Sequence, residues 1–262
     1  MQNIIFDYLC LRIIRYVGLV HSSKIKCQNV YMFFLVDTNN KIIFGWSAKC
    51  GCSHIKNIYW FLQTDKSTNK IHKNDRNNLP NDIEHYITLI FCRNPYKRII
   101  SGFLDKYKKN GGCRHLWKES SLTFSQFVDK LIACDWTMID RHHFTPQTTE
   151  HFDNNILLSK IVKIYDICNI DYEYIEQLYN KKIPEYVLNK KMGHEATFRT
   201  KRNDCIEKYV YDLDIDEYSD CNVETKYFYS EEIKENVFKF YINDFNFFDK
   251  NGIHYINSLD EI

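Results

Sequence analysis

Two short apolar runs, each followed by an amphipathic segment, dominate the hydrophobic pattern of the chain. The first run is Ile42-Ile43-Phe44. A turn of small residues follows at 48–53, and apolar residues then recur at helical spacing from Ile55 to Leu62. The second run spans 86–92 and precedes another segment with helical spacing. Strands that alternate with helices in this way predict an α/β fold.

Local signals predict where several elements begin. The apolar run 30–36 should pair with the 42–45 strand as a hairpin, because Asp and Asn residues at 37–40 suit a turn. Asn94 followed by Pro95 predicts a helix start, and Thr-Phe-Ser-Gln at 123–126 matches a capping box.

The end of the chain and two polar segments complete this picture. A final helix is expected from near Ser230 to Asn251-Gly252, where the glycine can end it. The polar segment 66–82 is a predicted loop. The polar and basic segment 180–206 is either a solvated loop or a flap over a ligand.

The turn at 48–53 has the layout of a phosphate cradle. Backbone N–H groups at such a turn and at the following helix start point at an anion, and Lys49 adds a flexible positive charge. The turn lacks the closing Gly-Lys-Ser/Thr of a Walker A motif. Taken alone, it is therefore equally compatible with an ordinary strand-to-helix connection carrying a surface lysine.

A second candidate site follows the 86–92 strand. Arg93 lies at its C-terminal end, where open α/β sheets bind ligands, and Ser101 lies two helical turns further on. An arginine and a hydroxyl group suit a second phosphate.

Together these two stretches resemble the PAPS-dependent sulfotransferases, most closely the Golgi carbohydrate sulfotransferases that act on chondroitin, dermatan and related glycans. The family's 5′-phosphosulfate loop has the form Pro-Lys-x-x-Cys-Thr-Asn-Trp-Lys, and residues 48–56 fall on it, with Ala48 for the proline. The 3′-phosphate motif has the form Arg-x-Pro-x-x-Arg-Leu-x-Ser-Ala, which residues 93–102 follow almost position by position. Further likenesses at 140–147 and 241–248 extend the resemblance over about residues 41 to 250.

The resemblance implies a P-loop-like sulfotransferase fold, a central, mainly parallel sheet flanked by helices, formed by residues 1–262 as a single domain. It implies that the chain binds PAPS (3′-phosphoadenosine 5′-phosphosulfate) and transfers its sulfuryl group to a hydroxyl of a glycan or another acceptor. The residues expected to bind PAPS are Lys49, Cys50, Gly51, Cys52, Ser53, His54, Ile55, Arg93, Arg98, Ser101 and Arg199.

Lys49 is also expected to stabilise the charge that develops in sulfuryl transfer. The acceptor hydroxyl needs a base, and His72 and His143 are the candidates. We expect His72 to take the proton and His143 to have a packed, orienting role; a carboxylate such as Asp105 or Asp140 is the alternative base.

Two other function classes stay open. One is a non-catalytic glycan- or nucleotide-binding protein on a sulfotransferase fold, and the other is a P-loop nucleotide kinase. The missing Gly-Lys-Ser/Thr disfavours the kinase. The joint presence of Lys49, Arg93 and Ser101 favours an active sulfotransferase.

Composition and charge exclude several classes of binding partner. A net charge of +1 gives no general attraction to nucleic acid. The ten cysteines are scattered, which favours reduced thiols, and Cys50-x-Cys52 is too closely spaced for a zinc pair, so no metal is expected. The apolar stretch 4–20 contains Asp7, Arg12 and Arg15 and is a poor membrane anchor. We therefore expect a soluble, cytoplasmic protein, unlike the Golgi relatives; the sequence does not predict its oligomeric state.

Overall fold

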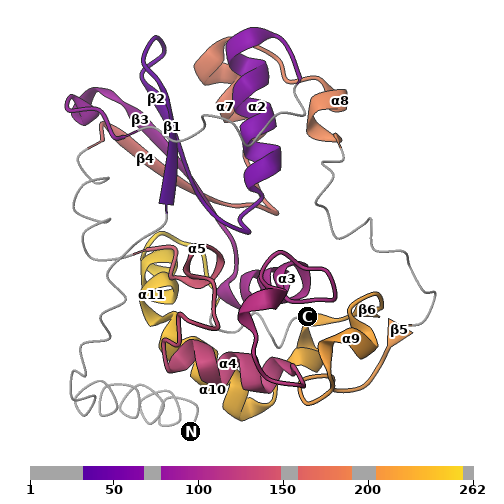
Figure 1. Cartoon of the computed structure of the whole chain (residues 1–262). Helices are drawn as coiled ribbons and strands as arrows, with labels where there is room; N and C mark the ends of the chain where they lie inside the picture. Colours follow the sequence, from indigo (N-terminus) through magenta and orange to yellow (C-terminus); the bar gives the residue numbers. More distant parts are fainter. Residues whose placement is uncertain (1–31, 68–77, 149–158, 191–204, 256–262) are drawn as a thin grey trace, which may run out of the picture.

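A four-stranded sheet forms the centre of the protein in the computed structural model, which describes residues 32–67, 78–148, 159–190 and 205–255. The strands are β1 (Met32–Asp37), β2 (Ile42–Ser47), β3 (Ile87–Cys92) and β4 (Ile161–Asp166), and they lie in the order β1-β2-β3-β4. β1 is antiparallel to β2, whereas β2, β3 and β4 are parallel. The predicted α/β fold with a mainly parallel central sheet is confirmed (Figure 1).

The β1–β2 hairpin forms as the turn residues predict. The Asp37 carboxylate accepts hydrogen bonds from the backbone N–H groups of Asn39 and Asn40, at 3.0 and 3.1 Å. Such local bonds satisfy the turn backbone and set the pairing of the two strands.

The predicted helix starts are also confirmed. The Asn94 side chain accepts the N–H of Tyr96 at 2.9 Å, Thr123 and Gln126 form the capping box, and Ser230 accepts the N–H of Ile233. The remaining elements are α2 (Cys52–Thr64), η1 (Ile83–His85), α3 (Pro95–Lys106), η2 (Arg114–Leu116), α4 (Phe124–Ile132), α5 (Arg141–Phe144), α7 (Tyr172–Tyr179), α8 (Glu185–Leu188), β5 (Cys205–Ile206), α9 (Ile215–Tyr218), β6 (Asn222–Val223), η4 (Thr225–Phe228), α10 (Glu231–Phe240) and α11 (Ile242–Lys250).

The central strand β3 separates two apolar cores. Successive side chains of a strand point to opposite faces, so Leu89 and Phe91 pack into one core with α2, α7 and α8. Ile90 and Cys92 pack into the other core with α3, α4, α10 and α11. Figure 1 shows the corresponding helices gathered in two groups, α2, α7 and α8 beside the sheet and the others beyond its β3–α3 end.

The prediction of a single final helix is wrong, because the segment forms two helices, α10 and α11. It is interrupted at Tyr241, whose backbone (φ −101°, ψ 22°) leaves the helical region between α10 and α11. The buried Tyr241 hydroxyl donates to the carbonyl of Phe144 at 2.7 Å. The break therefore coincides with a tertiary contact that helical periodicity does not reveal.

Helix α3 and the short helix α5 approach each other closely at Gly102. A Cβ atom at this position would lie 2.6 Å from the ring of Phe144, which is fully buried. Only glycine allows this separation, and it brings α5 against the face of α3. Within the described ranges, the helices are all too short or too polar to cross a membrane.

Candidate functional site

The loop between β2 and α2 has the backbone of an anion cradle. Lys49 and Gly51 both adopt left-handed conformations, with φ of 68° and 64°. A left-handed conformation is uncommon for a lysine and is typical of backbone held for a function. Gly51 is the N-cap of α2, and no side chain caps this helix start. The first-turn amides and the helix dipole therefore favour a negatively charged ligand here.

The Lys49 side chain turns toward the C-terminal end of α3. Its Nζ lies 2.9 Å from Asp105 Oδ2, and the same oxygen lies 3.0 Å from Lys106 Nζ. Burial lowers the pKa of Lys49, while Asp105 acts in the opposite direction. Burial alone would raise the pKa of Asp105, but the two lysines outweigh it and lower that pKa to about 2. The Asp105 carboxylate is therefore ionised at neutral pH and favours the charged form of Lys49.

Gln147 joins the loop to the segment after β3. Its Oε1 accepts from the Cys50 thiol at 2.8 Å and from the Arg93 backbone N–H at 3.1 Å, while its Nε2 donates to the Arg93 carbonyl at 2.9 Å. The Arg93 guanidinium also donates to the Lys49 carbonyl at 3.2 Å. These bonds fix the two predicted phosphate-binding segments relative to each other.

A buried carboxylate in α11 supports this junction. Asp244 is fully buried and accepts from the backbone N–H of Gln147 at 2.9 Å, and from the N–H and hydroxyl of Thr148 at 2.8 and 2.9 Å. Burial raises the pKa of Asp244, and the nearby Arg98 opposes that effect. The segment that contains Gln147 is therefore anchored to the C-terminal helix.

Arg98 is an internal anchor of the loop. It is only 2% exposed, and its guanidinium donates to the carbonyls of Ala48 and Thr145 at 3.0 and 2.9 Å. These contacts give it a positioning role, and they offer no support for the predicted direct contact with PAPS.

Ser101 lies on the face of α3 that is directed at the loop. Arg98 and Asp105 contact the loop at Ala48 and Lys49, and Ser101, at i+3 from Arg98, shares their side of the helix. It is half-buried. Its hydroxyl therefore lies on the same side of α3 as the cradle.

His143 and Asp140 form a hydrogen-bonded pair at α5. The Asp140 carboxylate contacts His143 Nδ1, and the backbone N–H of Asp140 donates to the hydroxyl of Tyr107 at 2.9 Å. Tyr107 is buried and its hydroxyl donates in turn to the carbonyl of Met138. Tyr107 thus holds the start of α5, and the carboxylate orients the imidazole.

The electrostatic surroundings of His143 link it to the loop. Burial lowers its pKa most, Asp140 raises it, and the positive charges of Lys106 and Lys49 lower it further. The fold therefore brings the loop lysine, the end of α3 and the α5 histidine into one cluster of charges, which we call the α3–α5 cluster (Lys49, Asp105, Lys106, Asp140 and His143).

The other predicted residues divide into three groups. Cys50 and Ile55 are buried in the interior, so their backbone alone can face a ligand. Cys52, Ser53 and His54 form the first turn of α2, and His54 Nε2 lies 2.8 Å from the hydroxyl of Tyr172. His72 and Arg199 lie outside the described residues.

The structure adds residues that no motif had marked for a specific role. Gln147 stood in a matched segment without an assigned role, and Asp244 belonged to a segment whose pattern indicated packing. Asp105 was considered only as an alternative base, whereas it is the partner of Lys49. The sequence signal for this role was the position of Asp105, one helical turn beyond Ser101 on the same face of α3.

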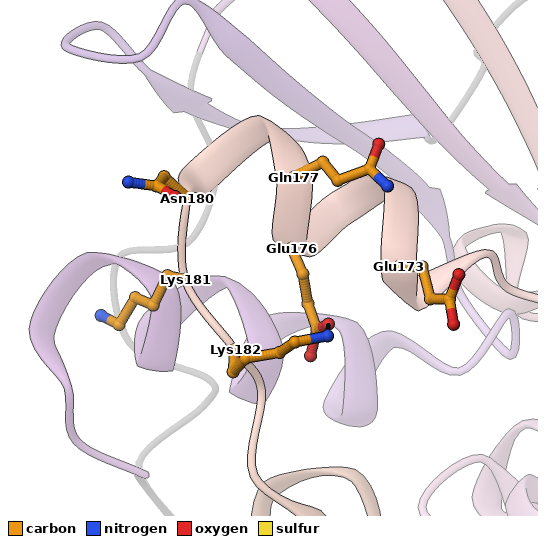
Figure 2. Close-up of a pocket in the computed structure, with 6 residues that line it drawn as sticks. All are labelled: Glu173, Glu176, Gln177, Asn180, Lys181 and Lys182. Carbon is orange, nitrogen blue, oxygen red and sulfur yellow. Dashed lines mark hydrogen bonds and ion pairs between the residues drawn. The ribbon is translucent and has the colours of Figure 1, made fainter.

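A surface hollow of about 380 Å³ lies elsewhere, along α7 and the segment after it (Figure 2). It is lined by Glu173, Glu176, Gln177, Asn180, Lys181 and Lys182. Lys181 donates to the carbonyls of Phe61 and Leu62 at the C-terminal end of α2, about 15 Å from the cradle at the other end of that helix. None of the predicted site residues lines this hollow.

Comparison with models of protein families gives a match over most of the chain. The model of a family described as the sulfotransferase family matches residues 32–251. No curated protein matches the chain, and neither does any solved structure.

Proposed function

Since this chain belongs to the sulfotransferase family, which its residues 32–251 match, we propose that it transfers a sulfuryl group from PAPS to a hydroxyl group of a carbohydrate acceptor. One observation carries the proposal beyond the family: the α3–α5 cluster brings the cradle lysine, Lys49, and a carboxylate-bound histidine, His143, into one electrostatic neighbourhood. Sulfuryl transfer needs a cation for the leaving oxygen and a base for the acceptor hydroxyl at the same place.

The residues around the cradle fit the two phosphate ends of PAPS. The uncapped start of α2 and the left-handed backbone at Lys49 suit the 5′-phosphosulfate. Arg93, which directly follows β3, and Ser101, on α3, suit the 3′-phosphate. Gln147 holds both segments, so the distance between the two subsites is fixed before the nucleotide arrives.

When bound, PAPS supplies an activated sulfuryl group whose S–O bond to the nucleotide breaks as the bond to the acceptor oxygen forms. Lys49 stabilises the negative charge on the oxygen that leaves with the nucleotide. His143 Nε2 takes the proton of the acceptor hydroxyl, while Asp140 holds the other nitrogen and stabilises the imidazolium.

His143 replaces His72 as our first choice for the base. The sequence favoured His72 because its polar loop could place a side chain beside the acceptor, but His72 lies outside the described residues. His143 has a carboxylate partner and lies near Lys49, and both features are those of a base rather than of a packing residue.

A carbohydrate acceptor suits the side of the site opposite the nucleotide. The segment 107–118 that follows α3 contains Lys108, Lys109, Arg114 and Lys118. Positive charge there favours an anionic glycan over a neutral phenol. We infer that one domain carries both the nucleotide and the acceptor sites.

The deciding experiment combines ligand binding with turnover. PAP should raise the melting temperature more than ATP or ADP does, and labelled PAPS should transfer its sulfuryl group to members of a glycan panel. Lys49→Ala should lower the rate of transfer by about 100-fold or more, while the matched variant Lys239→Ala, on the outer face of α10, should leave it unchanged. Stabilisation by ATP instead of PAP would favour a nucleotide kinase. PAP binding without transfer to glycan or phenolic acceptors would favour a non-catalytic binding protein.

A further inference from the structure

A tight loop brings Cys113 to the α3–α5 cluster. The Cys113 backbone N–H donates to the carbonyl of Lys106 at 2.9 Å, which closes the chain back onto the end of α3. The loop depends on Gly111, because a Cβ atom there would lie 2.4 Å from that same carbonyl oxygen. The fold therefore holds a half-buried thiol at a defined place beside the site.

Cys113 shares its surroundings with Asp140 and His143. One ligand atom from each of the three residues (a sulfur, a carboxylate oxygen and an imidazole nitrogen) lies within 4.8 Å of the other two. The Asp140 carboxylate contacts the imidazole of His143, and the Cys113 thiol lies close to both groups. The cysteine spacing in the sequence predicted no metal site, because these residues come from separate segments that only the fold unites.

The three side chains match the ligand set of zinc. Zn²⁺ binds sulfur at about 2.3 Å and nitrogen or oxygen at about 2.0–2.2 Å, so its ligand atoms stand roughly 3–4 Å apart. Small side-chain rotations bring these atoms to that spacing. Three protein ligands leave a fourth position for water. A thiolate ligand favours Zn²⁺ or Co²⁺ over Mg²⁺.

The charges around the site permit such an ion. A Cys113 thiolate and the Asp140 carboxylate together cancel its two positive charges. Two lysines add positive charge near the three ligands: Lys49 from the loop and Lys106 from α3. Asp105 contacts both lysines and neutralises one of the two charges.

We propose that Cys113, Asp140 and His143 form a Zn²⁺ site, and that Zn²⁺ bound there stops proton transfer by His143. Without the ion, Asp140 accepts the Nδ1 proton, so Nε2 carries the lone pair that a base needs. Zn²⁺ takes the Nδ1 lone pair instead, and the imidazole proton then resides on Nε2. Ion binding releases the Cys113 thiol proton to solvent. The inhibitory part rests on the proposed function; the binding part does not.

Cobalt spectroscopy tests the binding part without PAPS or turnover. Wild-type protein and the matched control Cys134→Ser should each bind Co²⁺ with a thiolate-to-metal absorption band that Zn²⁺ abolishes. Cys113→Ser should lack the band and bind Zn²⁺ about 10-fold more weakly or worse. Alkylation mapped by mass spectrometry on the wild-type protein needs no variant: Zn²⁺ should protect Cys113, whereas Mg²⁺ should not. An unchanged band in Cys113→Ser, or no protection of Cys113, overturns the site.

Kinetics test the inhibitory part. Zn²⁺ should inhibit wild-type sulfuryl transfer, a chelator should restore it, and Cys113→Ser should keep its basal activity with about 10-fold lower sensitivity. Calorimetry should give the same PAP affinity with and without Zn²⁺. Equal inhibition of both proteins, or loss of PAP binding on adding Zn²⁺, contradicts inhibition through His143.

Discussion

Lys49 Nζ and Asp105 Oδ2 lie 2.9 Å apart, so the cation of the predicted cradle is held by a carboxylate one helical turn past Ser101. In the proposed reaction, Lys49 would have two competing anionic partners, the carboxylate and the leaving oxygen. Asp105 is therefore a positioning residue that sets both the direction and the charge of the lysine.

Replacement of Asp105 by Asn should change the pH dependence of turnover. Burial lowers the pKa of Lys49 and Asp105 counteracts this effect, so the variant lysine should lose its proton at a lower pH than in the wild type. The basic limb of the kcat profile should move downward in pH, with little change at pH 6. Asp129→Asn, on the exposed face of α4, is the control. If the basic limb stays at the same pH, Asp105 does not control the charge of Lys49 during turnover.

Replacement of Lys49 by Ala should lower kcat by about 100-fold or more, as loss of one stabilising group does. Affinity for PAP should fall much less, because the backbone amides of the cradle remain. Steady-state kinetics and calorimetry measure the two effects separately. Near-normal turnover in this variant would reject the stabilising role.

Arg93→Ala should weaken PAP binding by about 10- to 150-fold, which corresponds to a charge-assisted contact of about 1.5–3 kcal/mol. Adenosine 5′-phosphosulfate lacks the 3′-phosphate and should lose much less affinity. Because Arg93 also donates to the Lys49 carbonyl, a small loss for both nucleotides is expected. Calorimetry makes the comparison, and Lys97→Ala in the first turn of α3 is the control. Equal losses for the two nucleotides would contradict binding of the 3′-phosphate.

The acidic limb of kcat/KM should report His143. Burial holds its pKa below the ordinary value of 6.5, so the limb should have its midpoint below pH 6.5. His143→Ala should lose the limb while PAP affinity stays intact, and His72→Ala should keep it. Asp140→Asn should move the limb to still lower pH, since Asp140 raises this pKa. If His72→Ala alone loses the limb, the assignment is reversed; if both variants keep it, the base is a carboxylate.

Asp244→Ala should destabilise the protein by about 3 kcal/mol or more, because three buried donors on Gln147 and Thr148 lose their acceptor. Urea unfolding measures the loss, with the exposed Asp249→Ala as control. PAP affinity should fall together with stability, since Gln147 holds the nucleotide segments. Unaltered PAP affinity in a folded Asp244→Ala variant would show that Gln147 does not need this support.

The sequence predicted those elements whose signals are local. The β1–β2 hairpin and the helix starts at Asn94, Thr123 and Ser230 depend on bonds within a few residues, and each forms as expected. The break at Tyr241 was missed; it coincides with a contact with Phe144, in a segment far away along the chain.

The candidate site shows the same contrast between local signals and contacts of distant segments. Motif spacing singled out Lys49 and Arg93, which lie just after the ends of β2 and β3, and the fold brings the two residues into contact. It could not separate Arg98 from them, because a buried arginine and a ligand-binding arginine look alike in sequence. Nor could it pair Cys113 with His143, or Gln147 with Cys50, because those contacts arise only from the packing of α3, α5 and α11.

The bond from Gln147 to Asp244 has a consequence for synthesis of the protein. Both predicted phosphate-binding motifs leave the ribosome before the carboxylate that holds their junction, because Asp244 belongs to α11 and follows them along the chain. A growing chain can form the sheet and the cradle while the connection between them is still loose. If the site binds the nucleotide as proposed, binding should begin only after α11 has been made, and a ribosome that stalls before α11 would release a chain with both motifs and a loose junction.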